Sequence, residues 1–356
     1  MTDAYIALAT GEVVEARARA PGEAYGELVF TTPYTGYEES LTDPSYEAQV
    51  LTFAYPLIGN YGVREERFES DRVHPSAVVA RELTDDVADW LTEEGVPAVD
   101  HVDTRDLVLD IREGGAMKCG IAAGPEATPE AAKAQLEQCP HMSDVTDIGE
   151  RVSVEEAEFY PADVEDPLTT ALVDCGTKHS IVESLNERGA DVHVLPYDVT
   201  TEEVEALDPD LLFVSNGPGD PANFEPTEDL VVDTIDEVPI AGICLGQQIV
   251  ARAVGGDTEK MAFGHRGVNQ PVLDVRTEQV VMTTQNHGYS VADPGNLEVT
   301  QVNVNDDTPE GLESPDHDII TRQYHPEAHP GPHDTLGFFD DVLAMAAEGA
   351  HPERAD

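Results

Sequence analysis

The sequence predicts an α/β protein, with a mixed N-terminal β/α domain followed by a doubly wound domain whose sheet is mostly parallel. The chain has 356 residues, more than one domain usually holds, so two hydrophobic cores are expected. An acidic stretch marked by prolines, residues 151–167, indicates a linker. Beyond it, strand-like and helix-like segments alternate, as they do around a parallel sheet. We therefore expect one domain over residues 1–150 and a second over residues 168–356.

Short β-type runs mark the N-terminal half of the chain. Apolar residues gather at positions 5–8, 50–53 and 77–79, and each run has the length of a short strand. Turn-rich stretches such as residues 31–43 separate the runs. This half of the sequence predicts a mixed and irregular domain without indicating how its strands pair.

The second half has a more regular pattern. Strands are expected at residues 171–175, 192–195, 211–215 and 239–244, and helices at 180–188, 228–236 and from 244 to 253. Further strand-like runs follow at 280–284, 297–302 and 318–324, and residues 335–347 have helical apolar spacing. The alternation in the first of these sets predicts a parallel sheet with helices on its faces.

The charge balance is extreme. The chain holds 72 Asp and Glu against 19 Lys and Arg, a formal net charge of −53, although 40% of its residues are apolar and can build a core. Such a surface repels nucleic acid and anionic membranes, so neither is expected as a partner. Concentrated salt screens the repulsion between carboxylates, which favours a halophilic source.

Cysteines and hydropathy indicate the compartment. The four cysteines lie far apart and form no C-x-x-C pair, so neither a zinc site nor a disulfide framework is expected. The first residues lack a basic start with an apolar core, and the sequence has no apolar run of membrane-spanning length. We expect a cytoplasmic protein.

A G-x-C-x-G segment carries the most chemical information. Gly242, Cys244 and Gly246 lie where an apolar strand meets a helix, the setting of a nucleophile elbow. Small neighbours suit such a tight turn, and the start of a helix favours a reactive thiolate. The alternative is a buried cysteine that packs between two glycines as a small hydrophobe.

A His-Pro-Glu segment follows the last predicted strand. His325 is therefore expected at the carboxyl edge of the sheet, where open α/β sheets bind their ligands. A cysteine nucleophile requires a base, and the base requires a carboxylate that fixes its tautomer. His325 and Glu327 can fill these two roles beside Cys244, whereas taken alone the segment is an ordinary turn.

A third segment, Ser-Asn-Gly-Pro-Gly-Asp-Pro at residues 215–221, follows another predicted strand. Gly217 and Gly219 would expose backbone N–H groups at the same sheet edge, where they can bind an oxyanion. The alternative is a simple turn.

Two other chemistries are disfavoured. His325, His329 and His333 have the spacing of a metal site on one helix face, but the prolines between them prevent a helix, so no metal is expected. The sequence contains neither a G-x-x-x-x-G-K-[ST] loop nor a G-x-G-x-x-G turn after a strand. Nucleotide chemistry is therefore expected on another polypeptide.

Together the three segments resemble the class I glutamine amidotransferases, in both order and spacing. Further segments resemble the small subunit of carbamoyl phosphate synthetase within that class: Thr35 to Tyr46, Gly59-Asn60-Tyr61-Gly62, Asp103-Thr104-Arg105, Cys175-Gly176-Thr177-Lys178, Gln285 to Tyr289 and Ala328 to Asp334. The chain departs from the family pattern at Gln247, Ser180 and Tyr289, where histidine, asparagine and phenylalanine are common.

The resemblance implies roles for individual residues. Cys244 would be the nucleophile, His325 the base and Glu327 its orienting carboxylate, with the N–H groups of Gly219 and Leu245 binding the oxyanion. The implied glutamine site consists of Ser45, Gly217, Gly219, Leu245, Gln248, Asn286, Gly288 and Tyr289.

The resemblance also implies an activity and a partner. The chain would hydrolyse L-glutamine through a cysteinyl thioester and deliver ammonia to a large ATP-dependent subunit, for carbamoyl phosphate used in arginine and pyrimidine synthesis. A heterodimer or a higher oligomer of such pairs is expected. This chain would need no cofactor, with ATP and Mg²⁺ bound by the partner. The alternatives are a free-standing cysteine hydrolase or peptidase of the same fold, the glutaminase subunit of another synthetase, and a non-catalytic regulatory subunit.

Overall fold

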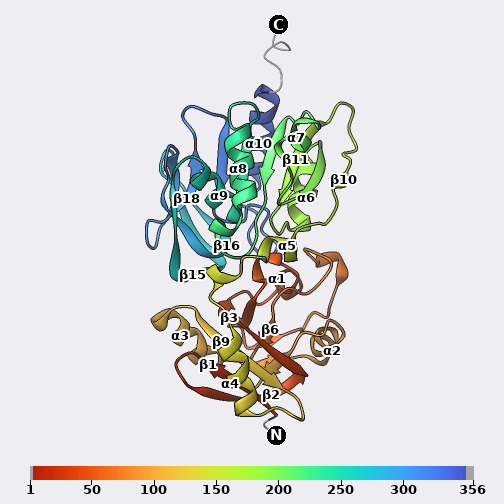
Figure 1. Cartoon of the computed structure of the whole chain (residues 1–356), viewed down its shortest axis with the longest axis vertical. Helices are drawn as coiled ribbons and strands as arrows, with labels where there is room; N and C mark the ends of the chain where they lie inside the picture. The colour runs from red at the N-terminus through yellow and green to blue at the C-terminus, as the bar shows by residue number, and fades with distance from the viewer. Residues whose placement is uncertain (1–2, 350–356) are drawn as a thin grey trace. The chain divides into compact units, whose positions relative to one another are not determined.

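The computed structural model describes residues 3–349, which divide into two compact units (Figure 1). The N-terminal unit runs to Val145 and also includes Met261–Gly267, a stretch from the middle of a later strand. The second unit holds Thr146–Lys260 and the chain from Val268 onward. The predicted linker is not without structure, because residues 158–160 within it form a strand.

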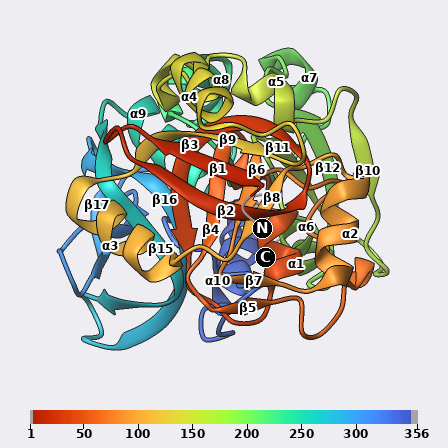
Figure 2. The same cartoon turned by 90° about the horizontal axis from the view of Figure 1, so that it is seen from below.

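A closed barrel forms the N-terminal unit (Figure 2). Its strands follow the order β1-β2-β8-β6-β4-β3-β9. They span Ala4–Leu8 (β1), Val13–Ala20 (β2), Gly22–Thr31 (β3), Gln49–Phe53 (β4), Ala77–Val79 (β6), Ala98–Asp100 (β8) and Met117–Ala123 (β9). A two-stranded sheet joins β5 (Leu57–Ile58) to β7 (Glu82–Leu83). The barrel interior is filled by aliphatic side chains such as Ile6, Leu28, Val50 and Ile121.

Four helices belong to the same unit: α1 (Tyr37–Leu41), α2 (Asp85–Glu93), α3 (Thr104–Gly114) and α4 (Pro129–Gln138). Three short 3-10 turns, Pro44–Tyr46, Glu65–Arg67 and Met142–Asp144, complete it. Side chains cap two of the helices, because Asp103 accepts from the N–H of Asp106 and Thr128 accepts from that of Ala131. Leu107 and Ile111 of α3 join the barrel core.

The second unit contains a ten-stranded sheet in the order β10-β12-β11-β13-β14-β19-β18-β17-β15-β16. The strands are Glu158–Tyr160 (β10), Leu168–Asp174 (β11), Ala190–Pro196 (β12), Leu211–Val214 (β13), Ile240–Ile243 (β14), Asp257–Asp274 (β15), Val280–Asp293 (β16), Glu298–Asn303 (β17), Pro309–Glu313 (β18) and Ile319–Arg322 (β19). The five strands from β12 to β19 are parallel. The pairs β10–β12, β15–β17, β17–β18 and β18–β19 are antiparallel.

Helices cover both faces of this sheet, as the α/β prediction requires. They are α5 (Ile148–Val152), α6 (His179–Asn186), α7 (Thr201–Glu205), α8 (Glu225–Thr234), α9 (Leu245–Ala253) and α10 (Gly337–Gly349). α6 and α10 share one core with the sheet, including Leu185, Phe213 and Phe339, whereas α8 and α9 lie together against the other face (Figure 1). The four functional loops leave the parallel strands β11, β13, β14 and β19 at their carboxyl ends.

Within residues 3–349, no helix combines the length and the apolar character needed to cross a bilayer.

Candidate active site

Cys244 occupies a sharp turn between β14 and α9. Its backbone has φ 54° and ψ −103°, a conformation that residues with a side chain rarely adopt. The N–H of Cys244 donates to the carbonyl oxygen of Arg322 on β19 at 2.7 Å, which fixes the turn to the neighbouring strand. The strained turn therefore presents the sulfur at the start of α9, as a nucleophile elbow does.

The two glycines of the elbow are required by close backbone contacts. A Cβ atom at Gly242 would lie 2.8 Å from the carbonyl carbon of Gly246. A Cβ atom at Gly246 would lie 2.1 Å from the carbonyl oxygen of Val214 on β13. The steric reason inferred from the sequence therefore holds at both positions.

His325 and Glu327 form a buried pair at the end of β19. Nδ1 of His325 lies 2.6 Å from Oε1 of Glu327, and both residues are 1% exposed. The backbone N–H of His325 donates to the carbonyl oxygen of Thr284 on β16 at 2.8 Å, which fixes the backbone that carries the ring. Because a carboxylate only accepts, Nδ1 carries a proton and Nε2 is the nitrogen that remains for chemistry.

Lys178, whose role the sequence did not indicate, completes this pair. Its buried Nζ donates to Oε1 of Glu327 at 3.0 Å and to the carbonyl oxygens of Ala328 and His329, each at 2.9 Å. The sequence did contain a signal for this residue. The chain has only four lysines, and Lys178 lies inside a segment that resembles the family.

The charges of this cluster shift its acid–base behaviour. Burial lowers the pKa of His325, but the charge of Glu327 and the nearby Cys244 outweigh it and raise this pKa to about 10. Burial raises the pKa of Glu327, but Lys178 and His325 outweigh it and lower this pKa to about 2. Nε2 of His325 has no partner with good hydrogen-bond geometry in the described chain. Cys244 nevertheless contributes to the raised pKa of His325, both as a hydrogen-bonding group and through its charge.

Strand β16 supplies contacts to the nucleophile. The Cys244 thiol donates a long hydrogen bond, 3.9 Å, to the carbonyl oxygen of Asn286. Gln248 on α9 donates to the carbonyl oxygen of Tyr289 at 2.8 Å and to Oε1 of Gln323 at 3.1 Å. The cation of Lys260 lies 5.8 Å from the centre of the Tyr289 ring. Asn286 therefore contacts Cys244, and Gln248 links α9 to Tyr289.

The glycine-rich loop after β13 packs against the loop after β11. Ser215 Oγ accepts from the N–H of Cys175 at 2.9 Å, and Oδ1 of Asn216 accepts from that of Lys178 at 3.2 Å. A Cβ atom at Gly217 would lie 1.9 Å from the carbonyl oxygen of Cys175. Gly219 has φ 90°, which favours glycine. The loop that carries both predicted glycines is therefore tied to the loop that carries Lys178.

Asp174, a second residue that the sequence did not single out, shapes the Lys178 loop. One carboxylate oxygen accepts from the N–H groups of Gly176 at 3.0 Å and Thr177 at 2.7 Å, and the other accepts from Val154 at 2.8 Å. Burial raises the pKa of Asp174 above its ordinary value even though these donors oppose the shift. Asp174 therefore holds the Lys178 loop together with the contacts from Ser215 and Asn216.

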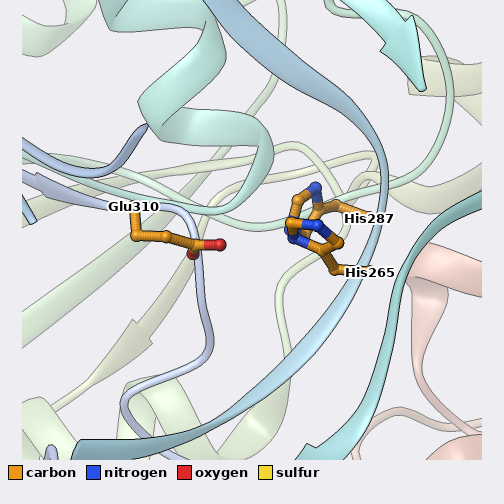
Figure 3. A group of neighbouring side chains, drawn as sticks. All are labelled: His265, His287 and Glu310. Carbon is orange, nitrogen blue, oxygen red and sulfur yellow. The ribbon is translucent and has the colours of Figure 1, made fainter. Parts of the chain in front are cut away.

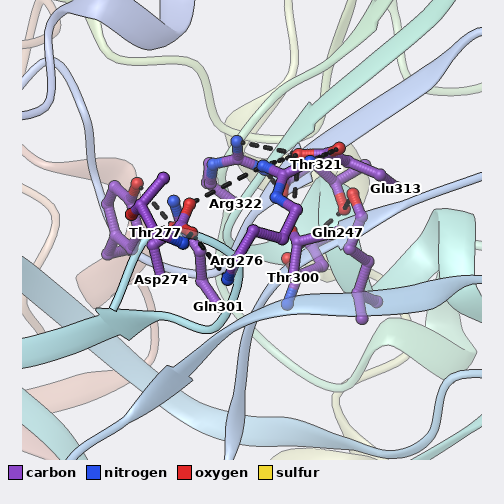
Figure 4. A network of polar contacts seen from close by, with 11 residues as sticks. Gln247, Asp274, Arg276, Thr277, Thr300, Gln301, Glu313, Thr321 and Arg322 are labelled. Atoms are coloured by element: carbon purple, nitrogen blue, oxygen red, sulfur yellow. Dashed lines mark hydrogen bonds and ion pairs between the residues drawn. The ribbon is translucent and has the colours of Figure 1, made fainter. Parts of the chain in front are cut away.

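An ionic network lies behind the elbow (Figure 4). The Arg322 guanidinium contacts Oε1 of Glu313 at 3.2 Å, and Glu313 also pairs with Arg276 at 2.6 Å. Thr321 lies 3.3 Å from Oε1 of Gln247, where the sequence departs from the family pattern. Because the carbonyl of Arg322 holds the Cys244 N–H, this network supports the strand on which the elbow rests.

The remaining residues of the predicted glutamine site are Ser45, Gly288 and Leu245. Ser45 lies in the N-terminal unit, buried in a 3-10 turn where its N–H donates to Asp43 at 2.9 Å, so its place in a glutamine site stays a prediction. Gly288 lies on β16 and Leu245 begins α9. The oxyanion roles of Leu245 and Gly219 likewise stay predictions.

The histidines outside the His325 pair have other contacts. The described chain forms no helix over residues 325–333, as the prolines predicted, and the rings of His329 and His333 stack with centres 6.1 Å apart. Figure 3 shows His287 on β16 and Glu310 on β18. Nδ1 of His287 lies 2.8 Å from the Tyr289 carbonyl oxygen, and Oε1 of Glu310 accepts from Asn303 at 3.0 Å. Together with His265, these two side chains bring ligand atoms within 4.8 Å of one another, an arrangement that could hold a metal ion.

Comparisons with known proteins agree with this geometry. Residues 171–345 match the class-I glutamine amidotransferase family, and residues 6–121 match the CPSase domain of the carbamoyl-phosphate synthase small chain. The carbamoyl phosphate synthase small chain of Halobacterium salinarum is 72% identical over 356 residues, covering the whole of both chains. That relative agrees with the halophilic source inferred from the charge.

More distant archaeal relatives align over nearly the same length. The small chain of Archaeoglobus fulgidus is 44% identical over 97% of this chain and 99% of its own. That of Methanocaldococcus jannaschii is 41% identical over 96% of this chain and 99% of its own. The chain therefore belongs to the carbamoyl phosphate synthase small chain family and carries a class-I glutamine amidotransferase domain.

Proposed function

We propose that this chain is the glutaminase subunit of a glutamine-dependent carbamoyl phosphate synthetase, with Cys244, His325 and Glu327 as its catalytic residues. The observation that carries the proposal is the conjunction of a cysteine on a strained elbow with a buried His–Glu pair. A structural cysteine requires neither the strain at Cys244 nor a charged histidine beside it. Family membership agrees with the reaction.

In the proposed first step, the Cys244 sulfur attacks the side-chain amide carbon of L-glutamine. The N–H groups of Gly219 and Leu245 hold the tetrahedral oxyanion. A pKa near 10 keeps His325 protonated at neutral pH, so Nε2–H can protonate the leaving nitrogen, which departs as ammonia. A thioester between Cys244 and the glutamyl group remains.

In the second step, water attacks the thioester and His325 accepts a proton from it, so that glutamate is released and the Cys244 thiolate and protonated His325 of the first step are restored. Glu327, held by Lys178, keeps the ring in one tautomer and orientation. Glu327 acts in the proposed triad by orienting His325, and Lys178 is a positioning residue that acts through Glu327.

The glutamine site combines backbone and side-chain groups. Gly217, Gly288, Asn286 and Tyr289 are proposed to bind the amino-acid end of the substrate together with Gln248. The amide nitrogen of Gln248 donates hydrogen bonds to Tyr289 and Gln323. Its Oε1 is therefore the atom that we propose accepts from the substrate's ammonium group.

Ammonia has to be used by a second polypeptide. We propose a large synthetase subunit that binds ATP and Mg²⁺, because this chain has no phosphate-binding glycine loop. The pair would act in arginine and pyrimidine synthesis as a heterodimer or a higher oligomer. A cytoplasmic location is supported by four free, buried cysteines.

A labelling experiment tests the glutaminase assignment. The chain in concentrated salt is treated with a glutamine analogue that has an electrophilic diazoketone in place of the amide, and the modified residue is found by mass spectrometry. We expect modification of Cys244 that glutamine prevents, while buried Cys175 serves as the unreactive internal control, since burial raises the pKa of its thiol. Hydrolysis of peptides without glutaminase activity would instead favour a peptidase.

A further inference from the structure

Three buried side chains from separate strands of the ten-stranded sheet gather at one point. His265 lies on β15, His287 on β16 and Glu310 on β18, and they are 6%, 4% and 0% exposed. Their ligand atoms, one from each residue, all lie within 4.8 Å of one another. Figure 3 shows the carboxylate of Glu310 directed toward the two imidazole rings. We call these three residues the His–His–Glu cluster.

Hydrogen bonds from the surrounding chain orient two members of the cluster. Nδ1 of His287 lies 2.8 Å from the carbonyl oxygen of Tyr289, and a carbonyl only accepts, so Nδ1 carries a proton. Nε2 then holds the lone pair that can bind a metal. Oε1 of Glu310 accepts from the side-chain amide of Asn303 at 3.0 Å. Metal-binding histidines usually donate their other N–H to a carbonyl or carboxylate, and metal-binding carboxylates are themselves hydrogen-bonded. Two of the three members therefore already have the outer contacts of metal ligands.

Gln285 brings a further oxygen to the cluster. Its Oε1 lies 3.2 Å from Nε2 of His287, while its amide nitrogen donates to Oγ1 of Thr283 at 3.1 Å. When Nδ1 carries the proton, Nε2 and this amide oxygen are both acceptors, so their approach favours a cation between them. Two ligands of one tetrahedral zinc ion, each about 2.0–2.2 Å from the metal, are about 3.4 Å apart. The observed separation is therefore close to that of two zinc ligands.

We propose that the His–His–Glu cluster binds one Zn²⁺ ion, with Oε1 of Gln285 as the fourth ligand. Imidazole nitrogen together with carboxylate oxygen suits zinc, whereas Mg²⁺ and Ca²⁺ prefer oxygen ligands alone. From separations of at most 4.8 Å, the ligand atoms have to approach by no more than about 1.4 Å, which rotation of the side chains supplies. All four donor residues are buried, so the site is closed, as structural zinc sites are. The ion would link three strands that lie far apart in the sequence and so stabilise the fold.

The metal-free alternative is an ion pair between a protonated histidine and Glu310. It accounts for one imidazole beside the carboxylate, but it gives no reason for a second imidazole at the same point. Two imidazoles and one carboxylate are, by contrast, a known donor set for zinc. The sequence did not indicate this site, because its members lie on separate strands without the spacing of a zinc motif. The ion pair predicts a chain without zinc and is therefore one outcome of the test.

The test measures zinc binding by the full chain, purified in concentrated KCl and freed of metal with a chelator. Concentrated salt screens the surface carboxylates and suppresses loose binding to them. Added Zn²⁺ is expected to remain on the chain through gel filtration at one ion per chain, and to raise Tm because it binds only the folded state. Mg²⁺ at the same concentration is expected to do neither. X-ray absorption at the zinc edge should show two imidazole ligands, and only nitrogen and oxygen at about 2.0–2.2 Å.

Substitutions locate the ion in the chain. Glu310→Gln removes the carboxylate charge but keeps an oxygen for Asn303, and His265→Asn removes one imidazole. Each is expected to raise the Kd for Zn²⁺ at least about tenfold. His333→Gln is the control, because His333 is exposed and its ring stacks on His329, outside the cluster. We expect less than a twofold effect from it.

A parental chain that retains no zinc would overturn the proposal and leave the ion pair as the explanation of the cluster. A sulfur ligand at about 2.3 Å would also overturn it, because the ion would then lie on a cysteine. So would unchanged zinc affinity in the folded cluster variants, or loss of zinc in His333→Gln. If the cluster variants do not fold, the X-ray absorption spectrum of the parental chain and the His333→Gln control decide the question.

Discussion

Replacing Lys178 by methionine removes the buried cation that holds Glu327. Methionine fills a similar volume, but Glu327 and the carbonyl oxygens of Ala328 and His329 each lose a donor. Breaking a buried ion pair from one side costs about 3–5 kcal/mol, and we expect about 3 kcal/mol because His325 still contacts Glu327 at 2.6 Å. For a unit of this size, that loss lowers Tm by roughly 6–12 °C.

The same substitution changes the pH dependence of glutamine hydrolysis. In the parental chain the pKa of Glu327 is about 2, so its carboxylate is charged from pH 4.5 to 10. Without Lys178 the burial of Glu327 is less opposed, so this pKa rises and protonation begins at a higher pH. A neutral Glu327 no longer raises the pKa of His325. We expect the acidic limb of the kcat profile to move to higher pH.

The stability that the His325–Glu327 pair contributes has a defined pH window. Glu327 has a lowered pKa, so its contribution is present above its ordinary value of 4.5 and is lost as the pH falls toward 2. His325 has a raised pKa, so its contribution is present below its ordinary value of 6.5 and is lost as the pH rises toward 10. Both contributions are complete only between these two ordinary values.

The assay measures kcat between pH 4.5 and 10, together with Tm, in concentrated salt. Lys133→Met is the control, because Lys133 is exposed. The pH profile of kcat and the Tm of this variant are expected to match those of the parental chain. An unshifted acidic limb and a parental Tm in Lys178→Met would refute the role assigned to the lysine.

Three further results are expected. Transfer from concentrated to dilute salt should lower the free energy of unfolding and abolish activity, because the −53 charge is then unscreened, and full stability in dilute buffer would contradict this. Asp174→Asn should lower kcat and cost about 1–3 kcal/mol, since at least one buried N–H loses its acceptor, and denaturant titration checks the cost. Gly246→Ala should destabilise the protein by at least about 1–3 kcal/mol through contact with the Val214 carbonyl, whereas Gly337→Ala, where nothing lies within 4 Å, should leave Tm near the parental value.

The sequence predicted the parallel half of the second unit well, because each βα segment is local. The strands β11, β13 and β14 and the helix α9 lie within a few residues of their predicted positions. The elbow at Cys244 was recognisable for the same reason, since its glycines and its strand-to-helix setting are contiguous in the chain.

The barrel and the support of the active site were not predictable in this way. The barrel closes through pairs far apart in sequence, such as Ala4 with Ala123, and two of its strands have only three residues. The contact between Lys178 and Glu327 joins positions 149 residues apart. Residues 261–267, in the middle of β15, return to the N-terminal unit, where Ala262 accepts from the N–H of Ala116 at 2.6 Å. Hydrophobic periodicity carries no information on such long-range pairings.

The most direct test of the proposed function measures two activities of one Cys244→Ala preparation in complex with the synthetase subunit. Carbamoyl phosphate synthesis is followed with glutamine as the nitrogen source and then with ammonium salts. Without the thiol no thioester forms, so we predict that glutamine-dependent synthesis is abolished while ammonia-dependent synthesis stays near the parental rate. Loss of both activities would indicate misfolding, which circular dichroism and Tm identify. Synthesis from glutamine at the parental rate would contradict the account, because Cys244 would then not be the nucleophile.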